Sequence, residues 1–223
     1  MLKRETTRQS VKDKRLIVNE NFFFKHIKRT LGVLSIILVQ SCGTSSIVIE
    51  GQFPSPNVNK IPLSIGVVYA QELINFNYVE YSEIGEEEYS IKSGQSHREL
   101  FDALLPSMFE QVVVLDSAES AASQEVDIIF LPVIEEFQLA LPNKTKLDVF
   151  EVWIKYNLRI SDTEGNGIAD WILTSYGKTP TRSMRSVENS INQAAVIALR
   201  DFASSFSLGF SQVPEIRQWL SQR

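Results

Sequence analysis

A strict alternation of apolar and polar residues over 149–161 constrains the fold of this 223-residue chain more than any other feature. The sequence there is VFEVWIKYNLRIS, and its even positions are all apolar: Phe150, Val152, Ile154, Tyr156, Leu158 and Ile160. A period of two places these side chains on one face of a β-strand. The segment therefore predicts a long half-buried strand, with Trp153 on the face opposite the core.

A turn and a second β-rich run follow this strand. The turn residues are DTEGNG, and the run is IADWILTSY over 168–176. Together they predict an antiparallel hairpin over about 147–176. If even residues pair with even residues, Trp153, Trp171 and Leu173 share the outer face and form a candidate interaction surface. In the other register Trp171 turns into the core, and a terminal segment over 213–220 could also cover the outer face.

Other strands are predicted by runs rich in β-branched residues. These runs lie at 61–69, 112–115 and 126–141, and one or two more polar strands are expected between 75 and 91. Pro132 implies a bulge or an edge position in its strand.

Helices are predicted where apolar residues repeat at helical spacing. The first begins with a capping box formed by Ser96 and Glu99, and Pro106 should kink or divide it. A long amphipathic helix is expected over 186–210, and a short helix over 214–220 after it. This order of elements predicts an α+β two-layer sandwich, in which two main helices cover a mostly antiparallel sheet. Residues 61–223 are expected to form a single domain of this class.

An apolar run near the amino terminus, LGVLSIILV over 31–39, is followed closely by Cys42, the only cysteine of the chain. The run is too short to span a bilayer, which needs about 20 apolar residues. Basic residues precede it and small residues follow it, as in a signal peptide. We therefore predict a signal peptide over 1–41. The alternative is a buried core helix.

The four residues Val39-Gln40-Ser41-Cys42 resemble the lipobox of bacterial lipoproteins. The resemblance implies cleavage before Cys42 and attachment of fatty acids such as palmitate to this cysteine. Several acyl chains would give the stable membrane anchoring that one chain does not. Gly43 stands where Asp would imply retention in the inner membrane, so the resemblance implies the outer membrane, facing the periplasm. Residues 42–60 are expected to form a lipidated tether that is mobile or extended.

The balance of charge changes at this junction. Of 22 basic and 27 acidic residues, nine basic and three acidic residues lie in 1–41, which leaves 13 basic and 24 acidic residues in 42–223. A domain with a net charge of about −11 lacks the basic stripe that nucleic-acid binding requires. We therefore expect no nucleic-acid partner, and contact with the membrane through the lipid anchor.

Patterns of catalytic or metal-binding residues are scarce in 42–223. The single histidine there, His97, is expected at the surface in the first turn of its helix rather than in a Ser-His-Asp arrangement. The DTEGNG segment partly matches a calcium loop, but Leu173 stands where a bidentate Glu is expected, and a hairpin turn is preferred. Glu135 and Glu136 should point to opposite faces of their strand. We predict no catalytic residues, no metal site and no cofactor.

The lipobox, the element order and the hairpin with Leu158, Asp162 and Gly165 resemble periplasmic lipoproteins with small α/β domains. These are the curli-secretion lipoproteins, the exopolysaccharide-export lipoproteins and the amino-terminal domain of the TolB protein. The resemblance implies a non-catalytic accessory or assembly role in an envelope export or surface-polymer system. It also implies an envelope protein partner or a homo-oligomer. The alternative is a periplasmic enzyme with an unrecognised carboxylate-based site.

Overall fold

A five-stranded sheet in the order β5–β2–β6–β7–β8 organises the residues that the structure, a computed structural model, describes: 44–85 and 87–222. Its strands are β2 (Ile61–Val68), β5 (Phe109–Leu115), β6 (Ile128–Ala140), β7 (Val149–Ser161) and β8 (Gly167–Pro180). A smaller sheet has the order β1–β4–β3, with β1 at Ser45–Val48, β3 at Asn77–Tyr81 and β4 at Glu87–Lys92.

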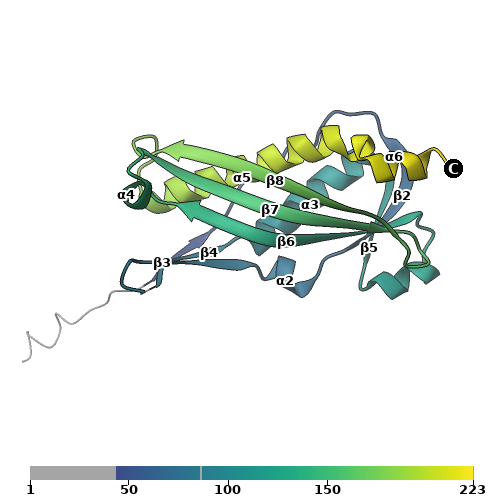
Figure 1. Ribbon diagram of the computed structural model, residues 1–223, viewed down its shortest axis with the longest axis horizontal. Helices are drawn as coiled ribbons and strands as arrows, with labels where there is room; N and C mark the ends of the chain where they lie inside the picture. The colour runs from purple at the N-terminus through teal and green to yellow at the C-terminus, as the bar shows by residue number, and fades with distance from the viewer. Residues whose placement is uncertain (1–43, 86, 223) are drawn as a thin grey trace, which may run out of the picture. The chain divides into compact units, whose positions relative to one another are not determined.

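Two long helices, α3 (Gly94–Met108) and α5 (Val187–Gly209), cover one face of the large sheet (Figure 1). The opposite face of β6, β7 and β8 carries no helix in this view. Shorter helices are α2 (Gln71–Ile74), α4 (Pro142–Thr145) and α6 (Pro214–Leu220), with 3₁₀ turns at Ala118–Ser123 and Phe210–Gln212. The predicted α+β class and two-layer arrangement are confirmed.

The predicted hairpin is confirmed as β7 and β8, which pair antiparallel along their whole length. Most paired residues of the sheet belong to the antiparallel pairs β6–β7 and β7–β8, so the sheet is mostly antiparallel. The remainder is parallel, because β2 pairs in that direction with both β5 and β6. Pro132 lies beyond Phe130, the last residue of β6 paired with β2, and the strand bulges between Ile134 and Glu136. The position of this proline thus agrees with the prediction.

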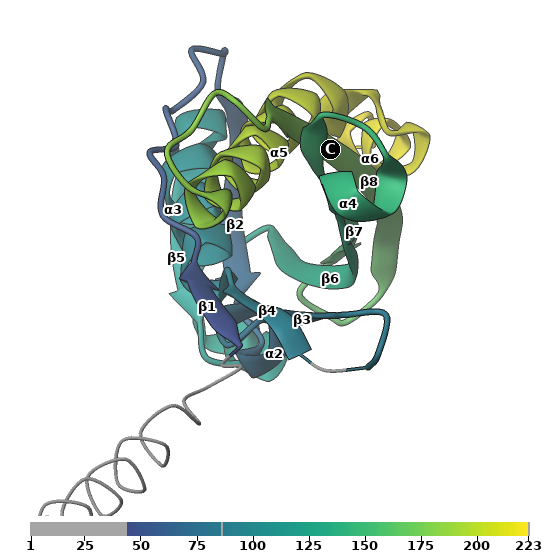
Figure 2. The ribbon, with the colours of Figure 1, turned by 90° about the vertical axis from the view of Figure 1, so that its left-hand side faces the viewer.

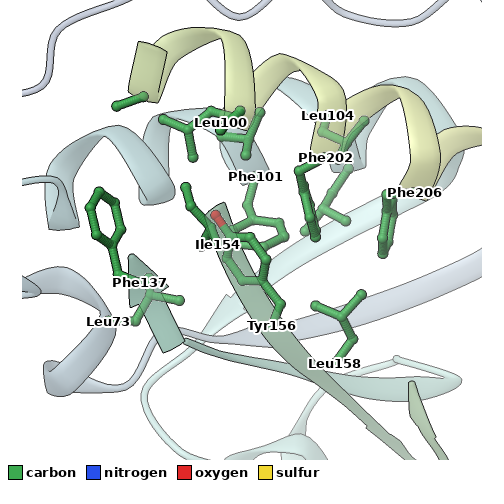
Figure 3. Close-up of a cluster of buried hydrophobic side chains, with 14 of the residues drawn as sticks. Leu73, Leu100, Phe101, Leu104, Phe137, Ile154, Tyr156, Leu158, Phe202 and Phe206 are labelled. Atoms are coloured by element: carbon green, nitrogen blue, oxygen red, sulfur yellow. The ribbon is translucent and has the colours of Figure 1, made fainter. Parts of the chain in front are cut away.

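The alternation in β7 has the predicted effect. Its even residues are at most 5% exposed and point toward the helices. Figure 3 shows Ile154, Tyr156 and Leu158 extending from this strand toward Phe101 of α3 and Phe202 of α5. Most core residues of the described chain join this one cluster.

The register of the hairpin is the one that pairs even residues of β7 with odd residues of β8. Leu158 lies opposite Trp171, Tyr156 opposite Leu173, and Trp153 opposite Tyr176. Opposed residues in an antiparallel pair point to the same face. Trp171 and Leu173 are therefore on the helix face, and the expectation that they share the outer face with Trp153 is wrong.

Helix α5 approaches the sheet closely at Gly177 of β8. A Cβ at this position would lie 2.1 Å from the carbonyl oxygen of Ala194 and 2.4 Å from the nitrogen of Ala198. Small residues on both elements therefore allow the two backbones to meet. The helix begins as predicted, because the side chain of Ser186 accepts a hydrogen bond from the N–H of Asn189 at 3.2 Å.

The predicted start of α3 is wrong. The helix begins at Gly94, so Ser96 is not its cap, and the Ser96 hydroxyl donates instead to the carbonyl of Ile49. Pro106 does not divide the helix, which continues past it to Met108.

The segment expected to be a tether belongs to the folded unit from Thr44 onward. Strand β1 pairs parallel with β4, and Ile47 and Ile49 are only 4% and 2% exposed. Burial of this apolar island stabilises the segment as a strand, so the domain begins at Thr44 and not at residue 61. The predicted signal peptide over 1–41 and Cys42 lie outside the described residues.

Candidate functional site

His97 is completely buried, which overturns its predicted surface position. Its Nδ1 lies 2.6 Å from the hydroxyl oxygen of Tyr156, and its Nε2 lies 3.1 Å from the hydroxyl oxygen of Ser93. Tyr156 is also fully buried, and Ser93 is 2% exposed. A neutral imidazole donates through one nitrogen and accepts through the other, so it satisfies both neighbours.

Burial governs the electrostatics of this group. Desolvation lowers the pKa of His97 to about 3 and raises the pKa of Tyr156 well above its ordinary value. Both groups are therefore neutral at ordinary pH. Since neither side chain reaches solvent, the pair links α3 to β7 and has no access to an external substrate.

A sequence signal for the burial of His97 does exist. Positions 97, 101, 104, 105 and 108 form one stripe at helical spacing, and His97 extends this stripe one turn before Phe101. Its polarity alone had suggested the surface. Phe76 adds an edge-on ring contact with a centroid distance of 5.8 Å, which closes the imidazole off.

The outer face of β6, β7 and β8 is the first candidate surface for contact with another molecule. Trp153 lies there beside Tyr176, with ring centroids 4.9 Å apart. The Tyr176 hydroxyl donates to Glu151 at 2.5 Å, and this hydrogen bond raises the pKa of Tyr176 to about 12. A shallow pocket of about 180 Å³ adjoins the indole, lined by Glu136, Gln138, Trp153, Lys155 and Thr174.

Trp171 and Leu173 take part in core packing. The Trp171 ring stacks on Phe206 of α5 with a centroid distance of 5.6 Å, and it would meet any Cβ placed at Gly209. Leu173 packs against the same core. Helix α6, with Ile216 only 2% exposed, also contacts β8. Of the three predicted residues, only Trp153 therefore lies on the outer face.

The DTEGNG segment forms the predicted hairpin turn. One oxygen of Asp162 accepts hydrogen bonds from the N–H groups of Glu164 and Asn166, at 2.9 and 2.8 Å. The Asn166 amide donates to the other oxygen at 2.8 Å, and these bonds lower the pKa of Asp162. Gly165 has a φ of 88°, which favours glycine. The carboxylate is therefore occupied by the turn itself.

A second candidate surface lies where β4, β7, α4 and α5 meet. A pocket of about 280 Å³ opens there, lined by Glu88, Tyr89, Leu141, Pro142, Asn143, Phe150, Thr181, Val187 and Ser190. Figure 2 views the domain from this end and shows α4, the first turns of α5 and β1 toward the viewer. Two segments border the pocket, α4 with the loop after it (142–148) and the loop 181–186, and both are almost entirely exposed.

Within residues 44–85 and 87–222, no group of three His, Cys, Asp or Glu side chains could hold a metal ion. No helix within them is both long and apolar enough to cross a membrane.

No protein-family model matches the chain, and no curated protein matches its sequence. Its fold is similar to that of solved bacterial proteins. A Xanthomonas campestris protein of family DUF330 has a TM-score of 0.48 at 12% identity, over 81% of this chain and 97% of that chain.

Two further similar structures are those of a lipoprotein and of a PelC oligomer. A minor lipoprotein of Acinetobacter baumannii has a TM-score of 0.37 at 12% identity, over 69% of this chain and 94% of its own. The PelC dodecamer of Paraburkholderia phytofirmans has a TM-score of 0.37 at 19% identity, over 68% of this chain and 91% of its own. The chain thus has a distant structural similarity to bacterial lipoproteins, which concerns the fold alone.

Proposed function

We propose that the protein is an envelope lipoprotein, anchored in the outer membrane through acylated Cys42 and facing the periplasm. In this proposal it is a non-catalytic accessory or assembly subunit of an export or surface-polymer system. The observation that carries the proposal is the sequence from Leu31 to Cys42, in which a short apolar segment ends in a lipobox-like tetrapeptide. The folded unit begins only two residues after this cysteine, at Thr44.

The non-catalytic part of the proposal is supported by the position of His97. It is the only histidine after Cys42, and its imidazole is enclosed by Ser93, Tyr156 and Phe76. A general base must come within hydrogen-bond reach of its substrate, directly or through one water. His97 does not meet this condition in the folded protein.

Contact with an envelope protein or with further copies of the chain is assigned to the outer face of β6, β7 and β8. Trp153 and Tyr176 form a partly buried aromatic pair there, and Ile172, further along the same face of β8, is 45% exposed. Aromatic side chains are enriched among residues that dominate binding energy at protein interfaces. This pair replaces the predicted set of Trp153, Trp171 and Leu173.

The anchor is tested by growing cells with a fatty-acid analogue and isolating the protein. Label is expected in the wild type and in a Ser46→Ala control, and none is expected in Cys42→Ser, which lacks the acyl-acceptor thiol. Membrane fractions separated by density should place the labelled protein in the outer membrane. Label retained by Cys42→Ser would refute anchoring through Cys42.

The contact face is tested by cross-linking in intact cells and by co-purification from solubilised membranes. Trp153→Ala should reduce cross-linked species at an unchanged melting temperature, while Thr174→Ala on the same face should have a smaller effect. Undiminished cross-linking in Trp153→Ala would remove this face from the proposal.

A further inference from the structure

We propose that two segments dock the domain on the surface of the bilayer that holds its anchor. They are α4 with the loop after it (142–148) and the loop 181–186, and they are together named here the basic loops. This inference rests on the proposed lipidation of Cys42. It adds an orientation, in which one defined end of the domain lies against lipid headgroups.

The length of chain between Cys42 and β1 supports this orientation. An extended chain spans at most about 3.6 Å per residue, so the chain from Cys42 to Ser45 can reach no further than roughly 11 Å. The Ser45 hydroxyl donates to a carboxylate oxygen of Glu188 at 3.2 Å, in the first turn of α5. The anchor is thus confined to the end of the domain from which α5 begins.

The basic loops lie at this same end. Loop 181–186 leads directly into α5, and its Thr181 N–H donates to the carbonyl of Asp148 in the other loop at 3.0 Å. Lys144 connects this end to the small sheet through its ion pair with Glu80, at 2.5 Å. The loops, β1 and the start of α5 are therefore parts of one connected surface (Figure 2).

The charge of the loops is opposite to that of the domain. They hold four basic residues, Lys144, Lys146, Arg182 and Arg185, and one acidic residue, Asp148. Within residues 44–85 and 87–222, no salt bridge is formed by Arg182, Arg185 or Lys146. Basic side chains without an ion-pair partner are attracted to an anionic lipid surface.

Exposed apolar side chains accompany these charges. Leu147 is 52% exposed and follows Lys146, and Met184 is 38% exposed between the two arginines. Val187, at 39%, adjoins them at the first residue of α5. Apolar side chains surrounded by Lys and Arg are typical of segments that lie in the interface of a membrane. Because the proposed anchor holds this end of the domain beside a bilayer, the partner that the basic and apolar side chains fit is a lipid surface with anionic headgroups.

The test uses the full chain as it is purified from cell membranes, reconstituted in vesicles that contain phosphatidylglycerol. Acylation consumes the thiol of Cys42, so a cysteine introduced by Met184→Cys is the only thiol that an environment-sensitive fluorophore can label. The matched control is Leu208→Cys, at a residue that is 73% exposed near the other end of α5. Twenty-one residues of helix separate the two ends, Val187 and Leu208, by about 30 Å.

The fluorophore at 184 should shift to shorter wavelength and be quenched by lipids that carry a spin label near the headgroup. The fluorophore at 208 should show neither effect. In the Arg182→Gln/Arg185→Gln background, the ratio of docked to undocked domain should fall roughly 5-fold for each lost charge. The same substitutions should have no effect on vesicles of neutral phosphatidylcholine.

Equal spectra and equal quenching at 184 and 208 would overturn the docking. Mass spectrometry of the same sample separates the two proposals, because it reports whether Cys42 carries acyl chains. Acylated protein with a solvent-exposed fluorophore at 184 refutes docking and leaves the proposed anchor intact. Protein that lacks acyl chains refutes the anchor itself.

Discussion

The Nδ1 atom of His97 in α3 lies 2.6 Å from the hydroxyl oxygen of Tyr156 in β7, and both side chains are fully buried. The two residues are 59 positions apart in the sequence. They connect the helix layer to the sheet, and Figure 3 shows Tyr156 among the buried side chains of the core. A buried polar pair that is fully satisfied specifies how the layers are aligned, because any shift leaves a polar atom without a partner.

The first prediction is that the domain loses stability in acid through His97. Its pKa is about 3 in the folded state, against 6.5 for an ordinary histidine. Below pH 6.5 the unfolded chain therefore binds a proton that the folded chain does not bind until about pH 3. The free energy of unfolding should fall over this range, by on the order of 2–3 kcal/mol at pH 4.5.

Urea denaturation of the wild type and of His97→Phe between pH 7 and 4.5 measures this effect. Carboxylates also titrate in this range, but they are the same in both proteins. The difference in slope therefore isolates the histidine, and parallel stability curves would contradict the prediction.

The second prediction concerns the hydroxyl of Tyr156. Tyr156→Phe removes the partner of a buried imidazole nitrogen, which should cost about 1–3 kcal/mol. Tyr69→Phe is the matched control, because its hydroxyl donates at 2.8 Å to Asp102, whose side chain is 46% exposed and can be hydrated instead. Chemical denaturation at pH 7 should give a larger loss for Tyr156→Phe. Equal losses would mean that the imidazole finds another partner.

The third prediction concerns the contact between α5 and β8. Gly177→Ala places a methyl group 2.1 Å from the carbonyl oxygen of Ala194, so the helix must move away from the strand. We expect a loss of about 2–3 kcal/mol or more. Gly167→Ala, in the same strand but with no atom within 4 Å of the new methyl, should change stability little. A similar melting temperature for both variants would contradict the close approach.

The fourth prediction separates the two tryptophans of the hairpin. Trp171→Ala removes a ring that stacks on Phe206, and it should cost about 2–4 kcal/mol. Trp153→Ala removes a ring from the outer face and should cost clearly less. Thermal unfolding of the two variants measures the difference. The reverse order of stability would place Trp153, rather than Trp171, on the core side.

The sequence pattern predicted the elements whose signal is local. The alternation of β7 and the apolar stripe of α5 each extend over many residues, and both elements occur within a few residues of their predicted bounds. The local sequence pattern does not decide the register of the hairpin, because β8 carries apolar residues at odd and at even positions, such as Trp171 and Ile172. A bulge beside Ser161, next to the turn, fixes it.

The pairing of strands that are distant in the sequence could not be predicted from sequence patterns. The parallel pairing of β2 with β5 and β6, and of β1 with β4, joins segments with a helix or a long connection between them. The short island at Ile47 and Ile49 resembled part of a tether, because its partner strand β4 lies about 40 residues further along. The predicted face was only partly correct for a different reason, because it depended on the register of the hairpin.

The parallel pairing of β1 with β4 has a mechanical consequence. A pull on the chain before Ser45 that is directed along β1 would load the hydrogen bonds between β1 and β4 in shear. In shear these bonds carry the load together, whereas a pull across the strand breaks them one after another. Because Ile47 and Ile49 are buried, they would leave the core in the same step. Under such a pull the first strand would separate from its sheet as one unit.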